Sequence, residues 1–256
     1  MRQITAAAAV AAVGILISAC GSGNQSGPAS TTTTSTNTTT TTTSSRPPVA
    51  QAALANLLLS PAEIDSLLGT TGMASQEKFD KPQDDNARQH WPQGWTWPAE
   101  CLYALGPAEG PVITDAGYTA INGDDSVAPL PPGSVDINPE VTQAVLLFPS
   151  ANEANAFFVT SSQRWPACAD HQFTTPGDAD TPELAWKVGP TSTANATLTA
   201  TLSMTATKNG ATHTMSCQRA LTVRNNIAID VATCRNDSAD LGVKVANQIA
   251  GKVDKP

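Results

Sequence analysis

The sequence predicts an α+β fold in which an antiparallel β-sheet is flanked by helices and held by two disulfides. Residues 184–234 contain four segments rich in Thr, Val and Ile, separated by Asn and Gly turns, a pattern typical of an antiparallel meander. Helices with capping signals precede and follow this region. Cys101, Cys168, Cys217 and Cys234 supply an even number of cysteines, as expected for two disulfides in an exported chain.

The first element is a secretory signal peptide over residues 1–19. Arg2 is its only charge, the apolar run AAAAVAAVGILIS follows, and small Ser18 and Ala19 precede Cys20. This run is shorter than the about 20 residues that cross a bilayer. We therefore expect cleavage, and no membrane span in the mature chain.

The end of the signal peptide carries a second motif. Ile17, Ser18, Ala19 and Cys20 resemble the lipobox of bacterial lipoproteins, whose cysteine receives a diacylglyceryl group and becomes residue one after cleavage. The resemblance implies lipidation at Cys20 with acyl chains such as palmitate. Two or more chains anchor stably, which predicts a permanent tether on the extracytoplasmic face of the cell membrane. The alternative is an ordinary signal peptide followed by an incidental cysteine.

Residues 20–47 form the predicted stalk, which begins at the lipidated Cys20. This Thr/Ser-rich segment contains no aromatic residue and no carboxylate. It cannot bury enough apolar surface to offset the entropy of folding, so we expect it to be disordered. It would span roughly 30 Å as a coil and up to ~90 Å if fully extended.

The remaining residues, 48–256, predict one folded domain without internal repeats. Without Arg2 and Arg46, 12 of the 14 basic residues remain against 22 acidic ones, a net charge of −10. That balance argues against nucleic acid as a partner and against electrostatic docking on anionic lipid. The membrane is thus expected to be reached through the lipid anchor only.

The first helix of this domain is predicted in the segment LLLSPAEIDSLLG. Ser60 is its expected N-cap, Pro61 its first residue, Glu63 the partner in a capping box and Gly69 its end. Farther along, the apolar run QAVLLF predicts a buried strand that ends before Pro149.

Two more helices are predicted from capping signals and apolar spacing. Ser150 and Glu153 form a second candidate capping box directly after the buried strand. The last helix has Asp237 or Ser238 as its expected cap. Its apolar residues recur every four positions, which predicts packing on a sheet: Leu241, Val245, Ile249 and Val253.

The last hairpin of the meander predicts a disulfide between Cys217 and Cys234. These cysteines are equidistant from Asn225 and Asn226, so a two-residue turn would place them opposite each other. The apolar residues on both strands are odd-numbered, however, and would share one face only if a β-bulge added a residue. We therefore expect a bulge. Cys217–Cys234 then contributes about 3 kcal/mol, and Cys101–Cys168 about 4 kcal/mol, to the free energy of unfolding.

A candidate ligand site is predicted near Cys101 and Cys168. The chain places three of its tryptophans shortly before Cys101 and one shortly before Cys168, so a disulfide would bring them together: Trp91, Trp95, Trp97 and Trp165. Such a cluster could line a ligand cleft, because Trp offers a large surface and one polar donor. The alternative is that these indoles pack over the disulfide as part of the core.

The sequence offers no recognisable catalytic or metal-binding motif. His90, His171 and His213 are scattered outside any nucleophile or zinc motif, and the cysteines lack the C-x-x-C spacing of metal or redox sites. Paired aspartates lie in polar, Pro- and Gly-flanked loops, where solvent exposure is the expected reading. We therefore expect no catalytic residue, no metal and no cofactor.

Taken together, the first helix, the Trp-rich lead into Cys101, WPAC at Cys168, the Cys217 and Cys234 hairpin and the closing helix resemble the mycobacterial family of PknH-like extracellular sensor domains. The resemblance covers most of residues 54–254. It implies an antiparallel sheet flanked by helices, pairing of the first cysteine with the second and of the third with the fourth, a cleft for an unidentified ligand, and no catalytic residues.

Two function classes follow for the domain. The first is a tethered, sensor-like lipoprotein that binds a small molecule, lipid or glycan. The family's receptor kinase carries a kinase domain and a membrane span that this sequence lacks, so sensing would pass to an envelope protein partner. The second is a cell-envelope hydrolase or accessory enzyme with an unrecognised site. A concave apolar cleft favours the first class; a buried His with a carboxylate and a hydroxyl in reach favours the second.

Overall fold

The computed structural model describes residues 46–84, 95–132, 137–178 and 181–255. The predicted signal peptide, Cys20, the stalk through residue 45 and Trp91 lie outside the described residues.

Helices and strands are interspersed in the first part of the domain, whereas the last five strands follow one another without an intervening helix before the last helix. The strands are β1 (Ala74–Phe79), β2 (Ala120–Val127), β3 (Glu140–Leu147), β4 (Gln172–Thr175), β5 (Glu183–Ala194), β6 (Thr197–Lys208), β7 (Ala211–Arg224) and β8 (Ile227–Arg235). The α-helices are α1 (Pro61–Leu68), α2 (Leu102–Leu105), α3 (Gly110–Ile113), α4 (Ala151–Arg164) and α5 (Leu241–Val253). Short 3₁₀ helices are η1 (Gln51–Asn56), η2 (Ala99–Cys101) and η3 (Trp165–Cys168).

All of these strands join one antiparallel sheet in the order β1-β2-β3-β8-β7-β6-β5-β4. The predicted meander is confirmed, because β5, β6, β7 and β8 pair consecutively. The predicted buried strand is β3, which pairs with β8 and so joins the meander to the earlier strands. The predicted α+β fold with an antiparallel sheet flanked by helices is confirmed.

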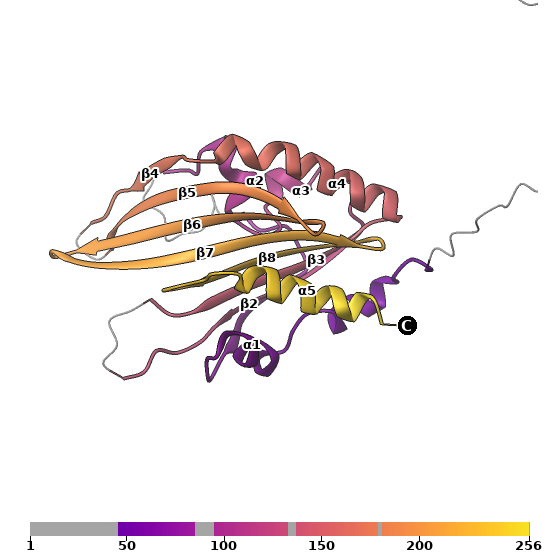
Figure 1. Ribbon diagram of the computed structural model, residues 1–256, viewed down its shortest axis with the longest axis horizontal. Helices are drawn as coiled ribbons and strands as arrows, with labels where there is room; N and C mark the ends of the chain where they lie inside the picture. The colour runs from indigo at the N-terminus through magenta and orange to yellow at the C-terminus, as the bar shows by residue number, and fades with distance from the viewer. Residues whose placement is uncertain (1–45, 85–94, 133–136, 179–180, 256) are drawn as a thin grey trace, which may run out of the picture. The chain divides into compact units, whose positions relative to one another are not determined.

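Helices cover both faces of the sheet (Figure 1). One face, which we call the α4 face, packs against α4, α2 and α3. The other, the α5 face, packs against α5 and α1. The predicted apolar stripe of α5 is buried on its face, where each such side chain contributes about 1.5–3 kcal/mol: Leu241, Val245, Ile249 and Val253.

The first helix, α1, has the predicted capping box. The Ser60 amide donates to Glu63 Oε2 at 2.7 Å, and the Glu63 amide donates back to Ser60 Oγ at 3.4 Å. At the other end Gly69 has φ 65°, a left-handed conformation that glycine adopts without a steric penalty.

The caps of the two long helices differ from the predictions. Ser150 caps α4, but its Oγ accepts from the Asn152 amide at 3.1 Å rather than from the third residue, and it also contacts the Glu153 carboxylate. The predicted cap of α5 at Asp237 or Ser238 is wrong. Helix α5 begins after Asp240. The Ser238 amide donates to Ser216 Oγ of β7 at 2.8 Å, so Ser238 lies in the segment between β8 and the helix.

The predicted β-bulge in the last hairpin is also wrong. Pairing runs without a shift from Arg224 with Ile227 at the turn to Cys217 with Cys234. The apolar residues of the two strands lie on opposite faces: Leu221 packs on the α4 face and Ile229 on the α5 face. The prediction assumed one buried face, whereas helices bury both.

Both predicted disulfides are confirmed. Cys101 is bonded to Cys168, with a Cα–Cα distance of 4.6 Å and a sequence separation of 67. Cys217 is bonded to Cys234, with a Cα–Cα distance of 4.0 Å and a separation of 17. The first joins η2 to η3, and the second joins two paired strands.

Candidate ligand-binding site

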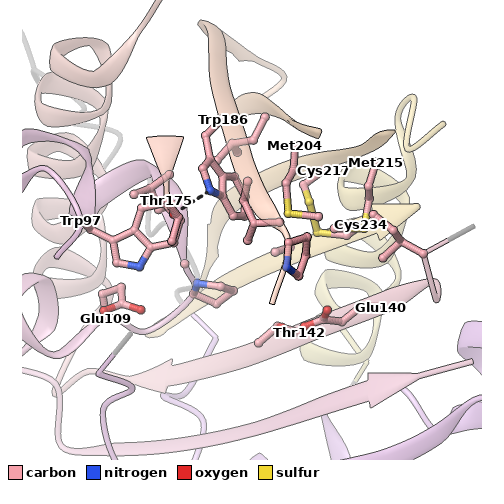
Figure 2. A pocket seen from close by; sticks show the side chains of 18 of the residues that line it. Trp97, Glu109, Glu140, Thr142, Thr175, Trp186, Met204, Met215, Cys217 and Cys234 are labelled. Carbon is pink, nitrogen blue, oxygen red and sulfur yellow. Dashed lines mark hydrogen bonds between the residues drawn. A yellow bond between two sulfur atoms is a disulfide. The ribbon is translucent and has the colours of Figure 1, made fainter. Parts of the chain in front are cut away.

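A cavity of about 450 Å³ opens on the α4 face of the sheet (Figure 2). Its floor is formed by alternate residues of five neighbouring strands, from Thr142 on β3 through Cys234 on β8, Cys217 on β7 and Met204 on β6 to Trp186 on β5. Side chains of a strand alternate between faces, and the pairing of these strands at these positions places the five residues on one side. The volume is in the range of small-molecule sites.

Sulfur atoms form the centre of this floor. Met204 and Met215 are directly paired across β6 and β7. Cys217, two residues after Met215 on β7, is bonded to Cys234. Figure 2 shows the four sulfur-bearing side chains together. Thioethers and disulfides are apolar and polarisable, and Met adapts its shape to what it contacts. This part of the floor therefore suits an apolar group.

An aromatic cluster closes one side of the cavity. Trp97 and Trp186 both line it, with their ring centroids 5.1 Å apart in an edge-to-face arrangement. Phe173 of β4 lies 5.4 Å from Trp97, and Trp95 lies 4.8 Å from Trp97. The Trp186 indole N–H donates to Thr175 Oγ1 at 3.3 Å, which holds the ring at the cavity edge.

The structure separates the tryptophans that the sequence grouped. Trp97 lines the cavity and Trp95 packs against the Trp97 ring, whereas Trp91 lies outside the described residues. Trp165 is 1% exposed and is not among the residues that line the cavity. The second indole that lines the cavity is Trp186. Sequence reasoning missed Trp186 because it lies far from Trp97 in the chain and meets it only in the folded domain, where Trp186 is paired with Phe173 and both rings contact Trp97.

A loop between α2 and α3 forms another part of the wall, and a buried ion pair holds it. Arg219 of β7 and Asp230 of β8 are 2.7 Å apart, with side chains 1% and 6% exposed. Arg219 Nη2 donates to the Gly106 carbonyl at 2.8 Å, and Asp230 Oδ2 accepts from the Ala108 amide at 2.9 Å. Each charge therefore fixes one backbone group of the wall.

Trp165 contributes to this anchor rather than to the cavity lining. Its ring lies 5.2 Å from Arg219 Cζ, within the range of a cation–π contact. Because Trp165 begins η3, which ends at Cys168, this contact ties the disulfide-linked segments to the sheet.

The polar groups of the cavity are mainly carboxylates and hydroxyls. Glu109 is 2% exposed and lines the wall, and Glu140 lines the floor at β3. The neighbouring Thr142 donates from Oγ1 to Asp125 Oδ1 at 3.1 Å, which places a third carboxylate behind the lining. Among the described lining residues there is no Lys, Arg or His.

The wall loop is held by hydrogen bonds on both sides of Glu109. The Gln83 amide donates to the Ala108 carbonyl at 2.9 Å, and the Gly110 amide donates to the Gln83 carbonyl at 2.7 Å. Together with the Asp230 contact, these bonds hold the backbone on both sides of Glu109. The carboxylate is thus presented from a fixed backbone (Figure 2).

A histidine lies close to a disulfide, outside this cavity. His171 Nε2 lies 3.5 Å from Glu100 Oε1, and both side chains are exposed by 40% or more. His171 also approaches Cys101 and Cys168, whose sulfur atoms are bonded to each other and so are not metal ligands. Among the described residues, His171 Nδ1 has no hydrogen-bond partner, and the neighbour of Nε2 is Glu100.

No helix among the described residues is both long and apolar enough to cross a membrane.

The profile of the family described as "PknH-like extracellular domain" matches residues 49–252. The chain is similar to the serine/threonine-protein kinases PknH of Mycobacterium bovis and Mycobacterium tuberculosis (strain H37Rv), with 31% identity over 208 residues, or 81% of this chain. It spans about a third of their length, 32% and 30%.

A solved structure is similar over the whole domain. The crystal structure of the extracellular domain of PknH from Mycobacterium tuberculosis has a TM-score of 0.65 and 29% sequence identity to this chain. The match covers 82% of this chain and 99% of that one.

Proposed function

Because this chain belongs to the PknH-like extracellular domain family, as its cysteine order and first helix predicted, we propose that it is an exported, membrane-anchored lipoprotein whose domain binds a ligand on the extracytoplasmic side. An extracytoplasmic sensor role fits this family. The lipid anchor at Cys20, the identity of the bound molecule and the absence of catalysis are parts of the proposal.

The observation that carries ligand binding is the cavity on the α4 face. It combines an apolar floor of Met204, Met215 and the Cys217–Cys234 disulfide with indoles and a few polar groups. An apolar pocket with few polar groups is the usual form of a small-molecule site. The Arg219–Asp230 pair holds one wall in place before any ligand arrives, which lowers the entropy lost on binding.

Binding without catalysis is supported by the chemistry of the lining. Its described groups are mainly apolar, with the carboxylates of Glu109 and Glu140 and the hydroxyls of three threonines. Thr142 and Thr175 are already engaged with Asp125 and Trp186. Nucleophilic catalysis needs a base within hydrogen-bond reach of the nucleophile, and the His171–Glu100 pair lies outside the cavity. Sensing would then be passed to an envelope protein partner.

The test uses Nile red, a neutral apolar dye, with the exported chain and two matched variants. Ala232→Phe fills the cavity, because Ala232 lines its floor, whereas Ala185→Phe adds the same ring at an exposed position of β5. We expect saturable dye binding that Ala232→Phe removes and Ala185→Phe leaves unchanged. All three proteins carry the same N-terminal segment, so any dye bound by a lipid anchor contributes equally to the three measurements.

Equal dye binding by both folded variants would rule out this cavity as the site. Turnover of an ester or glycan substrate that Ala232→Phe abolishes would instead favour the envelope hydrolase. Native mass spectrometry of protein purified from its own envelope would show whether a small molecule, lipid or glycan is retained.

A further inference from the structure

We infer that the cavity selects neutral, planar aromatic molecules of at least two fused rings, which lie flat on the sulfur-bearing floor beside the indoles. This inference rests on the proposed function and adds the class of ligand. It follows from the shape of the apolar part of the floor and from the chemistry of its side chains.

The apolar part of the floor consists of two parallel rows of side chains that cross the strands. In the first row Trp186 of β5 is paired with Met204 of β6, which is paired with Met215 of β7. In the second row Leu202 of β6 is paired with Cys217 of β7, which belongs to the disulfide with β8. All of these residues line the cavity. The rows are two residues apart along each strand, or about 6.8 Å at about 3.4 Å per residue.

These dimensions favour a flat ligand over a single extended chain. Strands lie about 4.8 Å apart, so each row extends roughly 10 Å across the strands that carry it. A fused ring system laid on the floor contacts both rows at once, whereas a single acyl chain follows one row and leaves the other uncovered. The cavity volume of about 450 Å³ leaves room for such a ring system.

The sulfur atoms of the floor favour an aromatic ring in particular. Met204 and Met215 supply two thioethers and Cys217–Cys234 supplies a disulfide, and Figure 2 shows these side chains next to one another. Sulfur makes favourable contacts with aromatic rings, at about 5 Å and often at the ring edge. A saturated ring system of the same outline fills the same space without these contacts.

The indoles at one side of the floor add contacts for a further ring. Trp97 and Trp186 both line the cavity, and their rings meet edge to face at an interplanar angle of 74° (Figure 2). Aromatic pairs prefer edge-to-face or offset-stacked geometry, and two nearly perpendicular rings present both an edge and a face to a third. A ligand ring that reaches this side therefore extends the aromatic cluster.

The lining disfavours a charged ligand of either sign. Among the described residues that line the cavity there is no Lys, Arg or His, so an anion finds no counter-ion there. Glu109 and Glu140 already interact with other groups of the protein, so a cation would have to displace those groups. Burial of an unpaired charge is costly, which leaves neutral molecules as the favoured class.

The experiment compares three neutral alcohols with the same number of carbon atoms: 2-naphthol, decahydro-2-naphthol and 1-decanol. Each is titrated below its solubility limit with the full-length exported chain, and calorimetry is the readout. We expect 2-naphthol to bind at least about fivefold more tightly than decahydro-2-naphthol, because only the aromatic probe gains the sulfur–aromatic contacts. It should also bind more tightly than 1-decanol, which covers one row and loses more conformational entropy on binding.

One double variant and one matched control assign this preference to the floor. Met204→Leu with Met215→Leu removes both thioethers at nearly constant volume, so the affinity ratio of 2-naphthol to decahydro-2-naphthol should fall about threefold. Met73→Leu removes a thioether that is buried on the α5 face, and it should leave the ratio unchanged. A ratio that the double variant also leaves unchanged would contradict the role of the sulfur atoms.

The outcomes separate the ligand class from the proposed function. Equal or tighter binding of decahydro-2-naphthol, blocked by Ala232→Phe, would overturn the aromatic preference and leave the cavity as the site. Tightest binding of 1-decanol would overturn the preference in favour of an acyl chain. Binding of 2-naphthol that Ala232→Phe leaves unchanged would place the probe elsewhere and overturn the inference. If Nile red binds in the cavity and 2-naphthol does not, the ligand class alone is wrong; if neither binds, the proposed function fails with it.

Discussion

Arg219 of β7 and Asp230 of β8 are diagonal neighbours in the sheet, their charged groups lie 2.7 Å apart, and both side chains are nearly inaccessible to solvent. Beside this ion pair, their hydrogen bonds go to Val231, Gly106 and Ala108. The pair thus connects the meander to the wall of the cavity through side chains that are adjacent in the sheet.

Breaking this pair is predicted to destabilise the domain strongly. Asp230→Asn should lower the free energy of unfolding by about 3–5 kcal/mol, because it leaves the Arg219 charge buried without its counter-ion. Urea unfolding measures the loss, and amide exchange at Ala108 should accelerate. The double variant Arg219→Met with Asp230→Leu should lose less than Asp230→Asn alone. A cost near zero for Asp230→Asn would contradict the proposed anchor.

Stability is predicted to depend on pH through Glu63. The Ser60 backbone amide, with Lys252 at 3.0 Å, lowers the pKa of Glu63 from 4.5 to about 2. A carboxyl whose pKa is lowered on folding stabilises the fold above its unfolded pKa, and this contribution is lost as pH falls from about 4.5 towards 2. Glu63 is 35% exposed, so solvent screening reduces the contribution to about 1–2 kcal/mol.

The variant Glu63→Gln tests this pH dependence. It should lower the free energy of unfolding by about 1–2 kcal/mol at pH 7, and the difference from the wild type should disappear near pH 2. Glu183→Gln, at an exposed strand position, serves as the control. A deficit that stays constant over the whole pH range would mean that packing, rather than charge, is responsible.

The two disulfides are predicted to stabilise the domain unequally. Replacing Cys101 and Cys168 with Ala should cost about 4 kcal/mol, and replacing Cys217 and Cys234 about 3 kcal/mol, because the loops they close differ in length. Denaturant unfolding of both variants measures the order. Only the second variant should also weaken Nile red binding, since only that disulfide lines the cavity.

Membrane attachment is predicted to require Cys20. In Cys20→Ala the lipid acceptor is lost, so the protein should move from the detergent phase to the soluble exported fraction. Phase partitioning with non-ionic detergent measures this. Retention of the variant on membranes would show that another feature attaches it.

The parts of the fold predicted from sequence are those with local signals. The capping box of Ser60 and Glu63 and the symmetry of Cys217 and Cys234 about the turn each depend on neighbouring residues, and both are confirmed. Strand β1 was missed because Phe79 is its only buried residue. Its position depends on a distant partner: a Cβ at Gly123 of β2 would overlap the Phe79 ring.

The cavity could be predicted only in part for the same reason. Trp97 was selected because it precedes Cys101, and it lines the cavity. The pairing of Arg219 with the α2–α3 loop and the approach of Trp186 to Trp97 depend on contacts between distant segments. Trp165 was grouped with Trp97 because it lies close to a disulfide in the sequence. Nearness to a disulfide does not distinguish a cavity-lining residue from a buried one, and Trp165 is buried.

The start of the described domain lies at the turn of the β7–β8 hairpin. The Asn225 side chain donates to the Pro47 carbonyl at 2.7 Å, and Arg46 contacts Asp254 at 3.2 Å. Cys217 lies roughly 27 Å along β7 from this turn, at about 3.4 Å per residue. With Cys20 as the proposed tether, the hairpin would act as a spacer: its turn lies where the stalk joins, and its open end holds the cavity. A protein that docks near the turn would then contact the far end of the same strands that line the cavity.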